Sequence, residues 1–202
     1  MRSAGGLIVA LVIMAPYVLQ AQQPGHRFEA GVQLALANPG EFDEVDSGVG
    51  GRVAWTPRGM VGFEAEVTVF PRAYSDGRAF SRRRVEGLFG LTVGPTLGRV
   101  RPFGRVRTGF LRFGEAPGRG FPCIRIYPEP LACALASGDT VTAVDLGGGL
   151  EVNASPRFFL RADVGDRVVR YSGPVMGRDR IPHEKAFFSH DLRLAVGAGV
   201  RF

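Results

Sequence analysis

Residues 192–202, LRLAVGAGVRF, decide the fold of this chain, because apolar residues alternate there with charged or small ones up to the last position. Side chains of a β-strand point alternately to its two faces, so a period of two predicts a strand with one apolar face. The same alternation recurs in residues 28–36, 61–70, 84–93 and 144–152. Three weaker stretches, at residues 48–56, 102–113 and 158–167, complete a set of eight predicted strands.

The composition fits a β protein that is rich in turns. Hydrophobic residues make up 45% of the 202 residues, too many for a disordered chain, and 29 glycines with 14 prolines argue against a coiled coil. The formal net charge of +6 comes almost wholly from arginine, since Lys185 is the only lysine. This charge alone does not indicate nucleic acid, and no nucleic-acid partner is expected.

The first residues read as a secretory signal peptide. Arg2 precedes an apolar run at residues 7–15, and Ala21 ends a small-residue cleavage site. The run is short for a membrane-spanning helix, and the alternative is an uncleaved anchor helix. We therefore predict a signal peptide at residues 1–21 and one β-barrel domain at residues 22–202.

The connections between the predicted strands alternate in length. Short ones that carry proline or glycine occupy residues 57–59, 95–99 and 154–157. Long polar ones occupy residues 38–47, 71–83, 114–139 and 172–186. Short turns at one end and long loops at the other are typical of outer-membrane barrels. A soluble ligand-carrying barrel shows the same strand periodicity with its apolar face inward, so periodicity alone does not separate the two.

Residue chemistry assigns the two faces of the predicted strands. One face is enriched in Gly, Asp, Glu and Arg, which suits a crowded, charged interior, and the aliphatic face then contacts lipid. Aromatic residues near the strand ends are expected to form girdles at the two membrane interfaces, the alternative being ordinary core aromatics. These are Phe28, Trp55, Phe70, Phe110, Tyr171, Phe188 and Phe202.

The C-terminal stretch resembles the terminal strand signature of bacterial outer-membrane β-barrel proteins, which the barrel-assembly machinery recognises. Phe202 closes it, with Val200, Val196 and Leu194 on the same face. The whole of residues 22–202 resembles the small eight-stranded barrels typified by the OmpA transmembrane domain and OmpX. The resemblance implies an all-β, antiparallel up-and-down transmembrane barrel, monomeric, in the bacterial outer membrane. Because the chain stops at the last strand, we expect no periplasmic peptidoglycan-binding domain and no cell-wall tethering.

Inward-facing charges are numerous and nearly balanced. We expect an ionic network that fills a closed lumen, since buried charges are costly unless they are paired. Its predicted members are Glu64, Glu66, Glu86, Asp145, Glu151, Asp163 and Asp191 with Arg84, Arg105, Arg107, Arg161 and Arg193, joined by Glu29, Arg52 and Arg201. Strand neighbours are expected to place Glu86 beside Arg105 or Arg107, and Arg107 beside Asp145. The alternative is a proton or ion path, for which an eight-stranded interior leaves little room.

The run Ser189-His190-Asp191 raises the hypothesis of nucleophilic catalysis, since some outer-membrane barrels are lipid hydrolases or acyltransferases. Successive strand side chains point to opposite faces, so Ser189 and Asp191 are expected to face the lumen and His190 the lipid or the rim. A catalytic base must lie within about 3 Å of its nucleophile. We therefore predict no catalytic residues, and a narrow channel or a lipid-modifying enzyme is the alternative function.

The acidic run Glu41, Asp43, Glu44 and Asp46 in the first long loop offers oxygen ligands of the kind that Ca²⁺ prefers. It lacks the spacing and the glycine of an EF-hand, so we expect a solvated acidic loop. No metal site and no cofactor are predicted. The three glycines at residues 147–149 lack the helix that follows a phosphate-binding loop and are expected to be packing glycines within a strand.

Two features of the long loops point to function outside the barrel. Cys123 and Cys133 lie in the longest loop, and export to an oxidising compartment predicts a disulfide between them. Arg78, Arg82 and Arg83 are cationic, and guanidinium groups bind lipopolysaccharide phosphates in a bidentate way, a solvated basic loop being the alternative. We predict a structural or surface-interaction role through these loops, with outer-membrane lipid and lipopolysaccharide as partners.

Overall fold

The computed structural model describes residues 27–42, 45–58, 60–71, 83–115, 126–178 and 180–202. The predicted signal peptide, residues 1–21, lies outside this part of the chain. None of the helices among the described residues is long and apolar enough to cross a membrane.

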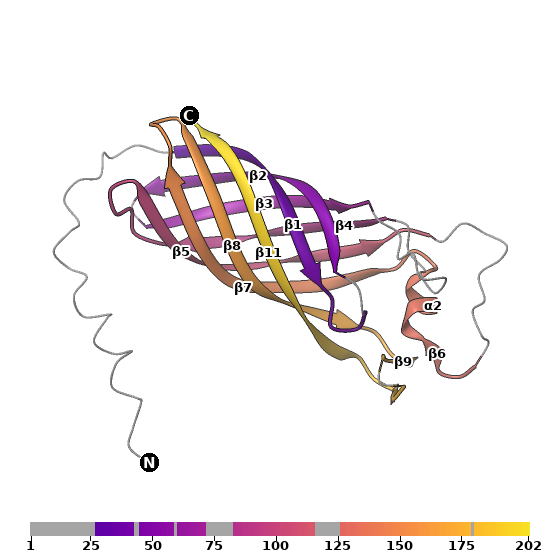
Figure 1. Ribbon diagram of the computed structural model, residues 1–202. Helices are drawn as coiled ribbons and strands as arrows, with labels where there is room; N and C mark the ends of the chain where they lie inside the picture. Colours follow the sequence, from indigo (N-terminus) through magenta and orange to yellow (C-terminus); the bar gives the residue numbers. More distant parts are fainter. Residues whose placement is uncertain (1–26, 43–44, 59, 72–82, 116–125, 179) are drawn as a thin grey trace, which may run out of the picture.

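Eight long strands form a closed antiparallel barrel, as the alternation of the sequence predicts (Figure 1). They are β1 (Arg27–Asn38), β2 (Asp46–Arg58), β3 (Val61–Phe70), β4 (Arg84–Val93), β5 (Val100–Phe113), β7 (Thr140–Asn153), β8 (Phe158–Tyr171) and β11 (Phe187–Arg201). Consecutive long strands pair with each other, and β1 pairs with β11 to close the ring. The predicted fold, an eight-stranded up-and-down barrel, is confirmed.

Short turns lie at one end of the barrel and the long connections at the other (Figure 1). The long connections contain the structure's only other described elements, β6 (Glu129–Pro130), α2 (Leu131–Leu135), β9 (Val175–Met176) and β10 (Pro182–His183). The three short strands make a small sheet in the order β10-β9-β6. We call these two ends the turn end and the loop end. Both Arg27 and Phe202 lie at the turn end.

The register gives the strands a steep tilt. Val100 on β5 has a register partner on β7, that residue has one on β8, and so on around the ring. The series comes back to β5 at Phe110, ten residues beyond its start. A stagger of this size in an eight-stranded barrel goes with strands tilted by about 40° from the barrel axis. We call residues at the same height along the barrel axis a level. From each strand to the next, the residue at the same level lies about one and a quarter residues away from the register partner.

The outer wall is apolar over most of its height. On β1 the outward residues from Phe28 to Leu36 are apolar, and at the same levels β3 presents Val61 to Val69. At about 3.3 Å per residue and this tilt, the run from Phe28 to Leu36 spans about 20 Å, close to the apolar band of a transmembrane barrel. Such a surface suits lipid and not water.

Aromatic residues gather on the outer wall at the turn end. Trp55 stacks between Phe28 and Phe63, with ring centroids 6.2 and 5.8 Å away. Among the other predicted girdle residues, Phe110, Phe188 and Phe202 are exposed. The girdle prediction is wrong for Phe70 and Tyr171, which are each only 1% exposed, because both continue the inward-facing series of their strands.

Glycine is concentrated on the inward face, where neighbouring strands of a small barrel converge. A Cβ added at Gly109 would strike the backbone carbonyl oxygen of Gly87, and one added at Gly147 would strike that of Val164. Gly104 points outward, and its nearest neighbour for such a Cβ is a carbonyl oxygen 3.9 Å away. The inward glycines therefore let the wall curve tightly around the charged side chains.

Candidate functional site

The lumen holds a network of arginines and carboxylates, with Arg107 at its centre. Its guanidinium donates to Glu66 at 2.5 Å, to Glu64 at 3.3 Å and to Asp145 at 2.9 Å. These three carboxylates come from β3 and β7, on either side of the barrel interior. Arg107 is 1% exposed, so every one of these contacts is made out of reach of bulk solvent.

Two more arginines connect opposite walls. Arg161 on β8 binds Asp163 at 2.9 Å and reaches Glu64 on β3 at 3.0 Å. Arg193 on β11 binds Glu86 on β4 at 3.0 Å and also pairs with Glu66.

Arg105 completes the middle of the network. It donates to Asp145 at 2.8 Å and pairs with Asp163. Asp145 therefore pairs with two arginines and Asp163 with three, the third being Arg193 at 3.9 Å, and the network is continuous through this part of the lumen.

The network extends toward both ends of the barrel. At the turn end, Arg52 lies 3.4 Å from both Glu29 and Glu64, and Arg201 donates to Glu29 at 2.8 Å and pairs with Glu151. Toward the loop end, Arg167 binds Asp191 at 2.7 Å and also pairs with Glu86.

Asp46 and Arg84 form a further ion pair at the loop end, where both side chains are buried. Asp46 was expected in a solvated acidic loop, and that prediction is wrong because Asp46 begins β2 and points inward. Glu41 of the same run accepts a hydrogen bond from the Arg178 amide at 3.1 Å, while residues 43–44 lie outside the described chain.

The predicted neighbours of Glu86 are wrong, and those of Arg107 are partly right. Glu86 faces Leu111 across β4 and β5, whereas Arg105 and Arg107 lie opposite Thr92 and Gly90. The stagger places Glu86 nearer the loop end, beside Arg167 and Arg193. Arg107 does lie beside Asp145, its register partner on β7.

Two buried arginines of the described chain were not among the predicted members of the network: Arg101 on β5, which is 7% exposed, and Arg167 on β8. Arg167 is the one that forms ion pairs with described residues. It is 1% exposed and joins β8 to β4 and β11. Its place in the inward series, two residues after Gly165 and four after Asp163, was a signal for it.

Aromatic rings also contact several of the lumen arginines. The guanidinium of Arg161 lies 4.0 Å from the ring centroid of Phe103, and those of Arg52 and Arg201 lie 5.3 and 4.9 Å from that of Phe159. Such cation–π contacts stabilise a cation that has left water. At the loop end, the guanidinium of Arg84 lies 5.6 and 5.9 Å from the ring centroids of Phe70 and Phe113, so such contacts occur at both ends of the lumen.

An apolar cluster closes the loop end of the lumen. Leu131 and Leu135 of α2 pack with Val175 of β9 against inward-facing residues of the wall, and we call these three side chains the lid. The wall residues beneath the lid are Leu88, Leu111, Phe113, Val141, Ala143, Val169 and Tyr171. Burying a leucine of this kind contributes about 2 kcal/mol, so the lid is held firmly on the barrel.

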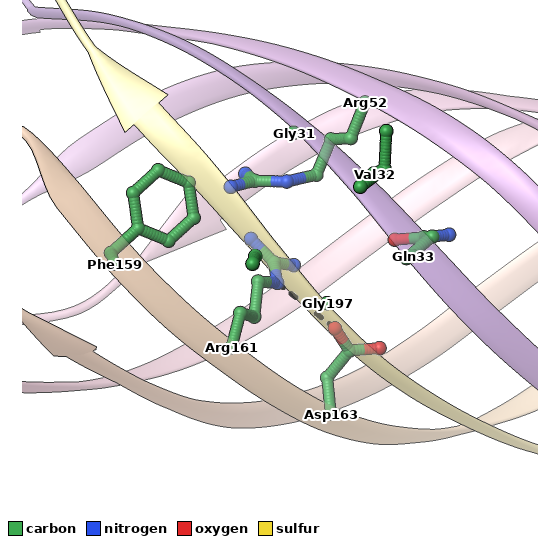
Figure 2. A pocket seen from close by; sticks show the side chains of 9 residues that line it. Gly31, Val32, Gln33, Arg52, Phe159, Arg161, Asp163 and Gly197 are labelled. Carbon is green, nitrogen blue, oxygen red and sulfur yellow. Dashed lines mark hydrogen bonds and ion pairs between the residues drawn. The ribbon is translucent and has the colours of Figure 1, made fainter. Parts of the chain in front are cut away.

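A small hollow of about 10 Å³, room for no more than one water molecule, lies near the seam between β1 and β11. Figure 2 shows Arg52 and Arg161 pointing into it, with Phe159 and Gln33 at its sides. Both arginines are already paired with carboxylates, Arg161 with the Asp163 drawn beside it. The hollow therefore presents satisfied charges and no group that awaits a ligand.

The Ser189-His190-Asp191 run does not form a catalytic triad. Ser189 and Asp191 face the lumen, where Asp191 accepts hydrogen bonds from Arg167 and from the Gly40 amide at 2.9 Å. His190 faces outward, and its Nδ1 lies 2.7 Å from Asp166 on the outer wall. Within the described ranges, no group of three or more His, Cys, Asp or Glu side chains is placed to hold a metal ion.

The residues predicted for assembly, for lipopolysaccharide contact and for the disulfide lie outside the lumen network or outside the described chain. Leu194, Val196 and Val200 point outward on β11, and the amide of Phe202 donates to the Phe28 carbonyl at 2.9 Å. Arg83 is exposed just before β4, and Cys133 lies on α2. Arg78, Arg82 and Cys123 lie outside the described residues.

The closed ring of eight tilted strands, apolar outside and charged inside, is the fold of the small outer-membrane β-barrels. Two solved structures are similar to this chain. Neisserial surface protein A (NspA) is 15% identical, with 88% of this chain and 97% of that one covered and a TM-score of 0.52. The outer membrane protein OprG from Pseudomonas aeruginosa is 11% identical, with 90% and 97% covered and a TM-score of 0.50. No protein-family model and no curated protein matches the sequence.

Proposed function

We propose that this protein spans the bacterial outer membrane as a monomeric barrel with a closed lumen and serves a structural or surface-interaction role through its long connections. The apolar outer wall, about 20 Å high, supports insertion in a bilayer. Arg27 and Phe202 both lie at the turn end. Together with export by the predicted signal peptide, this supports an orientation with the turns in the periplasm. The long connections then face the outside.

The observation that carries the closed lumen is the continuous set of ion pairs beneath the lid. Arg161 and Arg193 connect opposite walls, and Arg107 binds Glu64, which Arg161 also binds, so these side chains lie across the path that ions would have to take. An eight-stranded barrel has room for little more than its own side chains. A narrow channel, the alternative function, would need these pairs to separate.

The protein is therefore expected in the outer-membrane fraction, folded into a form whose gel migration changes on heating. In planar bilayers, the purified refolded protein should show no steady openings, since its axis is filled by paired side chains and covered by the lid. An open porin recorded in the same bilayer is the control. Steady openings on the order of a nanosiemens would contradict the closed lumen, and recovery in the soluble periplasm would contradict membrane insertion.

Phe202 is proposed to act during assembly more than in the finished barrel. Its side chain is 78% exposed and its only described hydrogen bond is made by the backbone, so deleting it removes little packing. We expect the deletion to lower the folded yield in cells several-fold while the refolded variant unfolds at nearly the parent's urea concentration. An unchanged folded yield in cells would refute the assembly role.

The disulfide between Cys123 and Cys133 stays a prediction. By chain-entropy estimates it would stabilise its short loop by about 2 to 3 kcal/mol. Because Cys133 lies on the helix that carries the lid, the bond would limit movement of Leu131 and Leu135. Mass spectrometry of the non-reduced protein should find a mass two hydrogens lower than after reduction. Equal masses would refute the bond.

We also propose that Arg78, Arg82 and Arg83 contact lipopolysaccharide. Arg83 is exposed at the loop end, directly before β4, where the outer leaflet would lie. Guanidinium groups bind phosphate through paired hydrogen bonds, which supports this choice of partner. The triple variant R78Q/R82Q/R83Q is expected to bind lipopolysaccharide more weakly and with less dependence on salt.

A further inference from the structure

Two arginines stand on the outer wall of the barrel and face away from the lumen. Arg112 on β5 and Arg170 on β8 are exposed, between inward-facing neighbours that are buried. No carboxylate among the described residues forms an ion pair with either of them. They thus differ from the arginines of the lumen, each of which faces the barrel interior.

The tilt of the strands brings these arginines to one height. Because a level shifts by about one and a quarter residues per strand, Arg112, Arg170, His190 on β11 and Arg83 before β4 lie within about 3 Å of the same level. The outward residues below this level are apolar on each of these strands, except for Thr108 and Asp166. The arginines therefore mark the upper edge of the apolar band.

Among the basic residues that the described strands carry at this level, Arg112 and Arg170 lie on β5 and β8, the two neighbours of β7. On the same level β1 presents Asn38, and Pro71 follows β3. The two arginines therefore flank β7 and fit an anionic partner that lies over this strand.

Hydroxyl groups lie between the two arginines. Thr142 on β7 is the register partner of Arg170, and Thr140 is that of Arg112. Arg112 and Arg170 are two strand spacings of about 4.8 Å apart, and their register partners on β7 are two residues apart. The two arginine Cα atoms are therefore about 12 Å apart. Each guanidinium can extend roughly half that distance, so both can reach one phosphate above Thr140 and Thr142.

Three carboxylates of the described residues lie on this side. The side chain of Glu115, three residues beyond Arg112, lies beside Gly138 toward the loop end. Asp166 lies 2.7 Å from His190 Nδ1, and it is four residues from Arg170 along β8, about 13 Å. Asp139 accepts a hydrogen bond from the Thr140 amide at 2.7 Å. Neither interaction uses the guanidinium groups of Arg112 or Arg170.

The wall below the arginines suits an acyl chain. Phe110 and Val106 on β5 and Val144 and Leu146 on β7 are exposed apolar residues at successive levels below them, with Thr108 among them. The outward-facing register partners Gly104 and Gly148 lie further down, eight residues from Arg112 along β5. A headgroup at the arginines therefore has an apolar surface beneath it for its hydrocarbon.

We propose that Arg112 and Arg170, with Thr140 and Thr142 between them, bind the phosphate of an outer-leaflet lipid whose acyl chain lies along β5 and β7. The site rests on the proposed membrane-spanning function. Its residues are other than Arg78, Arg82 and Arg83, which the proposal above names. The apolar band below the arginines selects a lipid phosphate over free phosphate, because only a lipid uses both surfaces.

Native mass spectrometry of the refolded barrel in detergent micelles, with bisphosphorylated lipid A as the probe, tests the site. The variant R112Q/R170Q should bind lipid A about tenfold more weakly than the parent, since two charge-assisted contacts are lost. The matched control R99Q/R157Q removes two exposed arginines at the turn end and should bind as the parent does. Dephosphorylated lipid A should bind weakly and equally to all three.

Equal affinities of parent and R112Q/R170Q would overturn the site, and so would an equal loss in R99Q/R157Q, which would indicate net charge alone. Displacement of lipid A by an equal concentration of inorganic phosphate would assign the site to free phosphate and overturn the lipid proposal. A loss confined to R78Q/R82Q/R83Q would place binding in the loop instead. Heat-modifiable gel migration of each variant shows that the barrel is folded, so failure of the site is distinguishable from failure of the barrel.

Discussion

Replacing Arg107 with alanine is expected to lower the free energy of unfolding by about 3 to 5 kcal/mol, because it leaves buried carboxylates without their cation. Glu64, Glu66 and Asp145 all bind this guanidinium, and none of them is near solvent. Their remaining partners, Arg105, Arg161 and Arg193 among them, cannot replace a contact at the centre of the barrel. Urea unfolding in lipid vesicles, followed by gel migration, measures the change.

Arg99→Ala is the matched control, since Arg99 is exposed beside the same strand and surface charges contribute little. We expect that variant to unfold at the parent's urea concentration. If Arg107→Ala changed the free energy of unfolding by less than about 1 kcal/mol, the carboxylates would have to be hydrated and the lumen wet. The closed-lumen proposal would then lose its support.

Gly109→Ala is expected to destabilise the barrel by about 3 kcal/mol, although it adds a single methyl group. The new Cβ would overlap the carbonyl oxygen of Gly87 and lie 3.0 Å from the Cα of Leu88, and both atoms belong to the neighbouring backbone. A flexible side chain would move aside, but here β4 and β5 must separate and lose ladder hydrogen bonds. Urea unfolding under the same conditions provides the measurement.

Gly104→Ala on the same strand separates crowding from backbone entropy. Its Cβ would point outward, 3.9 Å from the nearest backbone atom, so the substitution is expected to change the free energy of unfolding by less than about 1 kcal/mol. Similar losses in both variants would mean that glycine is needed on β5 for some reason other than curvature of the inner wall.

The alternation of the sequence predicts the existence and order of the strands but underestimates their length at the loop end. β8 continues to Tyr171 and β11 begins at Phe187, beyond the predicted limits. Val168 and Val169 point to opposite faces of β8, and Phe187 and Phe188 to opposite faces of β11, yet all four are apolar. The inward residues, Val169 and Phe187, pack in the apolar cluster beneath the lid. A period of two disappears where both faces are apolar, so the lid was not predictable from that signal.

A strand pattern assigns a residue to a face but not to a neighbour. It placed Glu86 inward correctly, yet its partners depend on the stagger between strands, which no periodicity reports. Phe70 and Tyr171 are a different case, since each continues a series of inward residues and counting by twos from Glu66 or Arg167 would have placed them inside. For these two aromatic residues, counting by twos along the strand predicts the face correctly, whereas closeness to a strand end does not.

The ion pairs across the lumen have a consequence for how the barrel is built. Arg161 and Glu64 are 97 residues apart in the chain, and Arg193 and Glu66 are 127 apart. A half-formed barrel in a bilayer would hold one member of each pair and expose it to hydrocarbon without its partner. We therefore expect folding to be cooperative, with strand closure and charge neutralisation occurring together and no stable hairpin intermediate inside the membrane.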